Sequence, residues 1–253
     1  MIIKKEVSIS CYQLKRTLHI YVPNNYTKSK RRYPVMYMFD GHNLFYDRDA
    51  TYHKSWGLKD YLDMHKVPMI IVGIECNHEG NKRLEEFSPY DFHDDDVGSI
   101  HGSGKQFLKW IVDELKPYID SHYRTKKGRQ NTAIAGSSMG GLMALYGCMQ
   151  YNHVFSKAAC LSCYLDEVFD DLSKEHYSMD PTTAIYLSWG SDEANTKDEL
   201  ALLSSRNLTI ANQLVKQNVS VLTNLVVKGT HSEASWEKEI PTFMKFLFPR
   251  QLF

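Results

Sequence analysis

The stretch AIAGSSMGGLMALY (residues 133–146) places two serines and three glycines between an apolar run and a helical pattern. Its pentapeptide 136–140 matches G-x-S-x-G, with Ser138 at the central position. In this motif the chain turns sharply from a buried strand into a helix, and the strained turn exposes the serine hydroxyl at the carboxyl edge of the sheet. A motif centred on Ser137 would need two glycines that the sequence lacks. The pattern therefore predicts Ser138 as a nucleophile.

A serine hydroxyl needs a base to accept its proton, and in sites of this kind the acid and then the histidine follow the serine along the chain. Three of the eleven histidines follow Ser138. His153 stands near the end of the next helical pattern and His176 lies in a polar stretch, as surface imidazoles do. His231 directly follows the last apolar run, where a loop returns to the strand ends. We expect His231 to be the base.

The base needs a carboxylate that fixes its tautomer, and two adjacent residues could supply it. The apolar run 183–190 is followed by Asp192 and Glu193. Neighbouring side chains in extended or turn backbone point in different directions, so we expect only one of the two to reach the imidazole. The longer side chain of Glu193 favours that residue, whereas Asp192 stands closer to the strand end and is the alternative.

An oxyanion hole requires two backbone N–H groups near the nucleophile. One should come from Met139, the residue after the serine, and the other from the loop after the apolar run 33–40. That loop reads FDGHNLFY, and its Gly41 permits a tight bend. We expect His42 to donate through its main chain rather than through its imidazole.

The hydrophobic pattern predicts a sheet that could bring these residues to one edge. Two opening segments alternate apolar and polar residues, as half-exposed antiparallel strands do, and later runs are wholly apolar, as parallel strands covered on both faces are. The apolar runs are 33–40, 68–75, 131–136, 157–162, 183–190 and 219–229, and helical patterns lie near 55–66, 104–120, 140–151, 196–217 and 235–247. We expect one α/β domain over 1–253, with about eight mostly parallel strands, two antiparallel strands at the N-terminus and helices on both faces.

One connection, 76–103, is longer than compact domains usually allow, and loops of this length are often functional. It carries Phe87 and Tyr90, so we interpret it as a flap over the site. These two aromatic residues, together with Tyr46 and Trp56, are candidate substrate-binding walls.

Composition narrows the class of partner. Lysine plus arginine equals aspartate plus glutamate at 30 each, which argues against nucleic acid, and no apolar run is long enough to cross a membrane. The five cysteines lie mostly in apolar runs without a zinc spacing, which favours reduced thiols in a cytoplasmic protein. The acidic run 91–96 has no second ligand cluster, so we interpret it as a solvated turn and expect no metal.

Taken together, these residues resemble the serine esterase family of the α/β-hydrolase fold, which includes esterase D (S-formylglutathione hydrolase), siderophore trilactone esterases and feruloyl and acetyl esterases. The resemblance rests on YMFDGHNLF, NKRLEEFSPY, AIAGSSMGGLMALY, LSWGSDE and GTHSEASW. It implies a Ser-acid-His hydrolase without a cofactor, and the family's Gly-Ser-x-Glu pattern at 190–193 selects Glu193. Relatives often have a Ser-Pro-aromatic run where this chain has LSCYLDEVF (161–169).

We therefore expect a carboxylesterase that acts on a small-molecule ester with a short acyl chain or an aryl group. The same fold could instead transfer the acyl group to an alcohol, or could serve as a binding protein that has kept the hydrolase scaffold.

Overall fold

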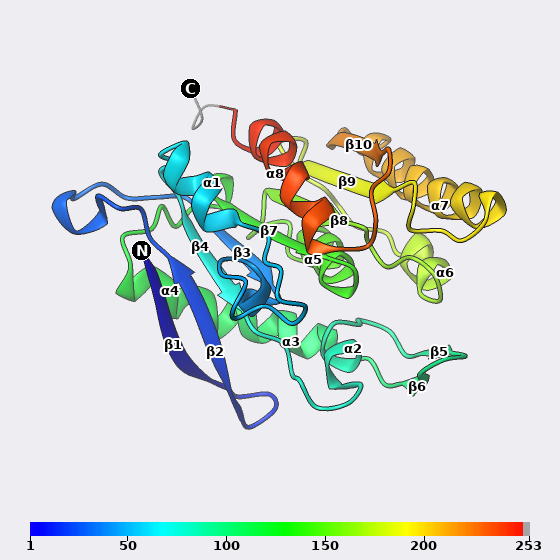
Figure 1. Cartoon of the computed structure of the whole chain (residues 1–253), viewed down its shortest axis with the longest axis horizontal. Helices are drawn as coiled ribbons and strands as arrows, with labels where there is room; N and C mark the ends of the chain where they lie inside the picture. The colour runs from blue at the N-terminus through cyan, green and yellow to red at the C-terminus, as the bar shows by residue number, and fades with distance from the viewer. Residues whose placement is uncertain (250–253) are drawn as a thin grey trace.

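The structure is a computed structural model that describes residues 1–249, and its centre is one eight-stranded sheet (Figure 1). Along the sheet the strand order is β1-β2-β4-β3-β7-β8-β9-β10. The strands are β1 (Ile2–Ile9), β2 (Leu14–Tyr21), β3 (Val35–Phe39), β4 (Ile70–Ile74), β7 (Thr132–Ser137), β8 (Lys157–Leu161), β9 (Ala184–Gly190) and β10 (Ser220–Val226). β1 pairs with β2, and β2 with β4, in antiparallel fashion, while every other pair is parallel. The predicted sheet, with two antiparallel N-terminal strands, is confirmed.

Burial along the strands follows their position in the sheet. Every residue of β3, β4 and β7 is buried, because helices cover both faces of the central strands. β1 and β10 lie at the two edges and are largely exposed or half-buried. Wholly apolar runs therefore become the centre of the sheet, and alternating runs become its edge.

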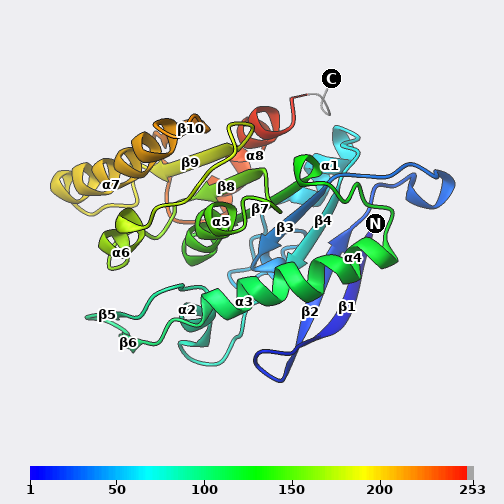
Figure 2. The same ribbon diagram turned by 180° about the vertical axis from the view of Figure 1, so that it is seen from behind.

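Helices on the two faces enclose two separate apolar cores. α1 (Leu58–Met64) and α8 (Glu233–Leu247) pack on one face, with Met36 and Met38 of β3. The other face carries Val35, Tyr37 and Phe39 of the same strand and is seen from the front in Figure 2. The helices on it are α3 (Gly104–Trp110), α4 (Lys116–His122), α5 (Met139–Gln150), α6 (Phe169–Lys174) and α7 (Lys197–Val215).

The helical pattern predicted near 104–120 consists of three joined segments. A π-helical turn, Ile111–Leu115, lies between α3 and α4, and Pro117 stands in the first turn of α4. Single π-turns of this kind often occur within longer helices. The pattern of apolar residues continues through the turn, so the sequence predicted one helix.

The 76–103 connection contains structure that the sequence did not predict. It holds α2 (Lys82–Glu86) and a hairpin of β5 (Phe92–Asp94) and β6 (Gly98–Ile100). Figures 1 and 2 show the hairpin extending away from the main sheet.

Two further findings bear on the expected class of protein. No helix within residues 1–249 is long and apolar enough to span a membrane. All five cysteines are free thiols; Cys11 is half-buried and the other four are buried.

Candidate active site

Ser138 occupies a strained turn between β7 and α5. The strand ends at Ser137, the helix begins at Met139, and Ser138 between them has φ 56° and ψ −127°. A positive φ is uncommon for a residue with a side chain and is a feature of nucleophile turns of this type. The Ser138 N–H donates to the carbonyl of Leu161 (3.0 Å), and the N–H of Leu142 donates to the Ser138 carbonyl (3.0 Å). These bonds hold the turn between β8 and the helix.

The glycines of the motif are required by close backbone contacts. A Cβ on Gly136 would lie 2.5 Å from the carbonyl oxygen of Gly140, and a Cβ on Gly140 would lie 2.9 Å from Cβ of Phe39. Neither position has room for a side chain. The helix can therefore begin directly against the strand, which is why small residues flank the serine.

His231 and Glu193 contact each other, although they are 38 residues apart. The Nδ1 atom of His231 lies 3.0 Å from Oε2 of Glu193, whose side chain is only 7% exposed. Asp192 is exposed, and its carboxylate accepts a hydrogen bond from the Ser191 hydroxyl (2.8 Å). Of the two carboxylates that the sequence offered, Glu193 is the one that contacts the imidazole.

The second oxygen of Glu193 is held by groups that the sequence analysis missed. Oε1 accepts hydrogen bonds from the Ser162 hydroxyl (2.7 Å) and the Gly190 N–H (2.5 Å). The indole N–H of Trp236 donates to the Ser162 hydroxyl (2.7 Å). Ser162 directly follows β8 and has φ 44°, and it lies in the segment that departs from the family pattern. Two groups thus hold Oε1, and Trp236 of α8 in turn holds one of them, the Ser162 hydroxyl.

The two expected oxyanion donors stand at the starts of helical turns, where N–H groups lack an intrahelical acceptor. Met139 is the first residue of α5, and His42 lies in the 3₁₀ turn Gly41–Asn43. A Cβ on Gly41 would overlap the Gly73 carbonyl carbon, so this turn packs directly on β4. The His42 ring is 6% exposed and its Nε2 lies 3.0 Å from the Thr51 hydroxyl. Burial lowers the pKa of this imidazole to about 4, so the ring is neutral at neutral pH.

An ion pair between a half-buried arginine and a buried carboxylate fixes the residue before this turn. Arg83 of α2 donates from Nε and Nη2 to the two carboxylate oxygens of Asp40, at 2.8 and 2.7 Å. Burial opposes ionisation of Asp40, but the Arg83 guanidinium outweighs it and the net effect lowers the pKa of that carboxyl. Asp40 itself has φ 54°. The 76–103 segment is therefore anchored to the loop that carries His42.

Two of the four candidate substrate-binding aromatic residues belong to the core instead. Phe87 has no exposed surface and lies 5.0 Å, centroid to centroid, from Phe39. Trp56 is 2% exposed and packs against Trp236. Large aromatic rings gain more from burial than from exposure, so Phe87 and Trp56 pack in the cores on the two faces of the sheet.

The other two candidates keep exposed surface. Tyr46 is half-buried, and the Arg48 guanidinium lies 4.9 Å from the centroid of its ring. Tyr90 is half-buried and its hydroxyl donates to Glu175 (2.8 Å). Only Tyr46 and Tyr90 remain available to contact a ligand.

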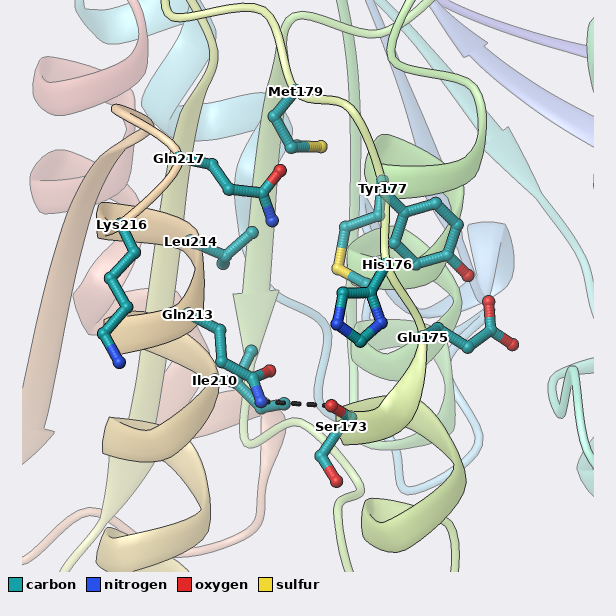
Figure 3. Close-up of a pocket in the computed structure, with 11 residues that line it drawn as sticks. Ser173, Glu175, His176, Tyr177, Met179, Ile210, Gln213, Leu214, Lys216 and Gln217 are labelled. Atoms are coloured by element: carbon teal, nitrogen blue, oxygen red, sulfur yellow. Dashed lines mark hydrogen bonds between the residues drawn. The ribbon is translucent and has the colours of Figure 1, made fainter.

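A well-defined hollow lies elsewhere, against α7 (Figure 3). It has a volume of about 220 Å³ and is lined by the end of α5, the segment 173–179 and the end of α7. Gln213 donates to the Ser173 carbonyl (3.0 Å) across it. None of the candidate catalytic residues lines this hollow, so the chemistry of the side chains, rather than cavity shape, locates the active site.

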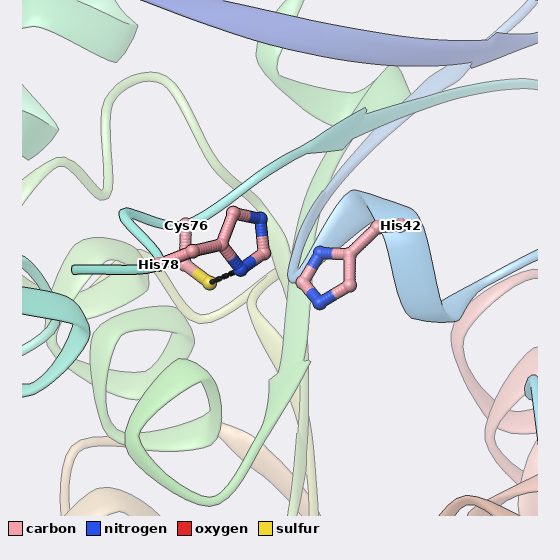
Figure 4. Close-up of side chains that lie close together, drawn as sticks. All are labelled: His42, Cys76 and His78. Atoms are coloured by element: carbon pink, nitrogen blue, oxygen red, sulfur yellow. Dashed lines mark hydrogen bonds between the residues drawn. The ribbon is translucent and has the colours of Figure 1, made fainter. Parts of the chain in front are cut away.

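One group of side chains could hold a metal ion. His42, Cys76 and His78 bring one ligand atom each within 4.8 Å of one another (Figure 4). Burial raises the pKa of the Cys76 thiol, and the neighbouring Asp40 carboxylate raises it further. No metal was expected from the sequence, in which these three residues do not form a recognisable ligand spacing.

A mostly parallel sheet with a serine on a strained strand-to-helix turn, followed along the chain by an acid and a histidine, defines the α/β-hydrolase class. Comparison with known families agrees. The chain belongs to the Putative esterase family, whose model matches residues 10–247. It is therefore an ester hydrolase of the carboxylesterase class.

Individual relatives are distant. The protein YbbA of Bacillus subtilis is 24% identical over 191 residues, which are 73% of this chain and 72% of YbbA. Esterase Rv1288 of Mycobacterium tuberculosis is 30% identical over 143 residues, which are 56% of this chain but only 28% of Rv1288.

Solved structures share the fold at low identity. An IroE-like serine hydrolase from Shewanella oneidensis matches with a TM-score of 0.77 and 20% identity, covering 98% of this chain and 80% of that one. A ferulic acid esterase matches with a TM-score of 0.71 and 19% identity, covering 100% of this chain and 99% of that one.

Proposed function

We propose that Ser138, His231 and Glu193 form a catalytic triad that hydrolyses small carboxylic esters. The contact between Glu193 and Nδ1 of His231 carries the proposal. A carboxylate on Nδ1 fixes the proton on that nitrogen and leaves Nε2 free to accept the serine proton. The strained conformation of Ser138 supports its role as nucleophile, because it matches the geometry that presents a hydroxyl at the sheet edge.

In the first half of the reaction, Ser138 Oγ attacks the ester carbonyl while His231 Nε2 accepts the hydroxyl proton. The oxyanion that forms accepts hydrogen bonds from the N–H groups of Met139 and His42, and Gly41 allows the second donor to approach. The imidazolium then gives its proton to the leaving alcohol. Water repeats the same steps on the acyl-enzyme and releases the acid. No cofactor takes part in this scheme.

The proposed substrates are esters with short acyl chains or aryl groups. The anchored 76–103 segment, with Tyr90 half-buried on it, supports a narrow site, and so does Tyr46 on the loop that follows β3. We also propose a cytoplasmic location, which the free, mostly buried thiols support.

A fluorophosphonate probe, which labels activated serines covalently, tests the nucleophile directly. We expect a single adduct that peptide mass spectrometry maps to Ser138, and no adduct on the Ser138→Ala variant. Ser137→Ala is the matched control and should label as the parent does. An adduct on Ser137, or none on either serine, would overturn the proposal.

Substrate class is tested with p-nitrophenyl esters of graded acyl length. We expect the highest kcat/KM between acetate and butyrate, because the anchored flap limits the length of the acyl site. Faster turnover of decanoate than of butyrate would contradict this expectation.

A further inference from the structure

Two neighbouring parallel strands bring three metal-binding side chains, two histidines and one cysteine, together at their carboxyl ends. His42 follows β3, while Cys76 and His78 follow β4, which ends at Ile74. The Cys76 sulfur lies 3.9 Å from Nδ1 of His78. The rings of His42 and His78 stand edge to face with centroids 4.7 Å apart. Figure 4 shows the His78 ring close to the sulfur and the His42 ring facing this pair from the 3₁₀ turn.

One nitrogen in this cluster lacks a partner. Nδ1 of His42 is buried and makes no hydrogen bond to any group within residues 1–249. The ring is 6% exposed, and its other nitrogen contacts the Thr51 hydroxyl. Buried polar atoms are nearly always paired, so an unpaired one in a native structure calls for an explanation. A bound cation would provide that partner, and Thr51 would then orient the ligating ring from its far side, as outer contacts of metal sites do.

We propose that His42, Cys76 and His78 form a site for one divalent cation, Zn²⁺ or a transition-metal ion with similar ligand preferences, with water as the fourth ligand. Two imidazoles and one thiolate suit zinc, a borderline-soft ion that is usually four-coordinate. In a tetrahedral site, bond lengths near 2.1 and 2.3 Å put ligand atoms about 3.5 Å apart. The present separations lie within 4.8 Å, so the three side chains need to approach by about 1 Å.

The surroundings allow both this movement and entry of the ion. His78 is exposed and lies on the 76–103 connection, so its side chain has room to move towards the other two ligands. A surface hollow of about 270 Å³ reaches Cys76 and His78, and Glu75 and Asn77 also line it. The cluster is thus accessible from solvent on one side and closed by the buried His42 on the other.

Metal occupancy should affect catalysis through His42, and this consequence rests on the proposed function. The main chain of His42 is the proposed second oxyanion donor. A cation bound to the His42 ring would pull on the side chain and so displace the loop that holds this N–H. A displacement of about 1 Å in catalytic geometry can cost about a hundredfold in rate. We therefore expect the bound cation to inhibit hydrolysis rather than assist it.

Titration of the full chain with Co²⁺ tests the site without any substrate. We expect one equivalent to bind, with the d–d bands of tetrahedral cobalt and a thiolate charge-transfer band, and Zn²⁺ to displace it. Cys76→Ser should remove the thiolate band, and both Cys76→Ser and His78→Asn should weaken binding at least tenfold. Cys11→Ser and His153→Asn are matched controls at positions outside the cluster and should bind as the parent does.

Absence of stoichiometric binding, or binding by Cys76→Ser equal to that of the parent, would overturn the site. Because His78 is exposed, His78→Asn should fold and keeps the test valid if the buried Cys76 variant does not.

A kinetic experiment tests whether a cation at the proposed metal site inhibits ester hydrolysis. Saturating Zn²⁺ should lower kcat of the parent at least tenfold on p-nitrophenyl acetate and leave His78→Asn unaffected, while EDTA should not lower the activity of either. Equal inhibition of both proteins, or none of the parent, would overturn the coupling to the oxyanion loop. An inactive parent would count against the proposed function alone, since the cobalt titration does not depend on turnover.

Discussion

Glu193 uses its two carboxylate oxygens differently, and this makes it the residue on which the proposed triad depends. Oε2 contacts His231, while Oε1 is bound by the Ser162 hydroxyl and the Gly190 N–H. Glu193→Gln would put an amide in place of the acceptor and leave the imidazole without its fixed tautomer. We expect kcat to fall by about 10⁴, as for the corresponding change in a serine protease.

Asp192→Asn is the matched control for this change, since the adjacent carboxylate is exposed and accepts a hydrogen bond from the Ser191 hydroxyl rather than contacting His231. Its kcat on the same p-nitrophenyl ester should stay near that of the parent. If Asp192→Asn lost most of its kcat while Glu193→Gln kept it, Asp192 would be the triad acid instead.

In the proposed triad, Ser162 would act through its hydrogen bond to Glu193, as a positioning residue. Ser162→Ala removes one hydrogen bond to the carboxylate and leaves the Trp236 N–H without its acceptor. A hydrogen bond to a charged group contributes about 1.5–3 kcal/mol, so kcat should fall by about tenfold to a hundredfold with KM unchanged. Ser121→Ala, on the exposed face of α4, provides the comparison. A change in KM alone would show that Ser162 contacts substrate rather than the acid.

At the scale of elements, the sequence predicted features that neighbouring residues specify, and it did not predict features that depend on contacts between distant residues. The apolar run 33–40 predicted a central strand because its character comes from burial on both faces, and β3 lies there. α2 and the β5–β6 hairpin are too short to show a period, so the 76–103 segment appeared only as a long loop. Ser138 was found from a five-residue motif, whereas Ser162 depends on contacts with residues 31 and 74 positions away.

A buried ion pair attaches α2 to β2, and its removal should lower the stability of the protein. The Arg16 guanidinium of β2 pairs with the buried Glu86 carboxylate, whose other oxygen accepts the Asn77 N–H (3.0 Å). Burial raises the pKa of Glu86, and Arg16 opposes that shift. Arg16→Met would leave the Glu86 carboxylate buried without its positively charged partner. Loss of one partner of a buried ion pair typically lowers the free energy of unfolding by about 3–5 kcal/mol.

Urea denaturation measures this effect, and the double variant Arg16→Met/Glu86→Gln should recover part of the loss because no charge remains buried. Lys82→Met breaks the more exposed Lys82–Glu85 pair on the same helix and should cost under about 1 kcal/mol. Equal costs for Arg16→Met and Lys82→Met would show that the buried pair does not anchor α2.

At the scale of the whole molecule, α8 joins the active site to one of the two cores. It begins two residues after His231, and its Trp236 both packs against Trp56 and contacts Ser162. Further along the helix, Glu239 is 4% exposed and accepts a hydrogen bond from the Tyr186 hydroxyl of β9 (2.6 Å). The same hydroxyl accepts from Asn224 of β10 (2.8 Å). This polar contact ties the middle of α8 to β9 and β10, beside the apolar side chains that the helix buries in the core.

Glu239 should therefore make global stability depend on pH in a defined direction. Burial raises the pKa of this carboxyl above its ordinary value, although the hydrogen bond from the Tyr186 hydroxyl opposes the shift. A group with a raised folded-state pKa contributes stability that is complete below its unfolded pKa, about 4.3, and is lost as pH rises through the folded value. Glutamine does not titrate, so the free energy of unfolding of Glu239→Gln minus that of the parent should increase from about pH 4 to about pH 8. Urea denaturation across this range measures the difference, with Glu237→Gln, a half-exposed carboxylate two residues earlier in α8, as the control. A difference that stays constant or falls with pH would mean that Glu239 remains ionised in the folded protein at no cost, and that its hydrogen bonds outweigh its burial.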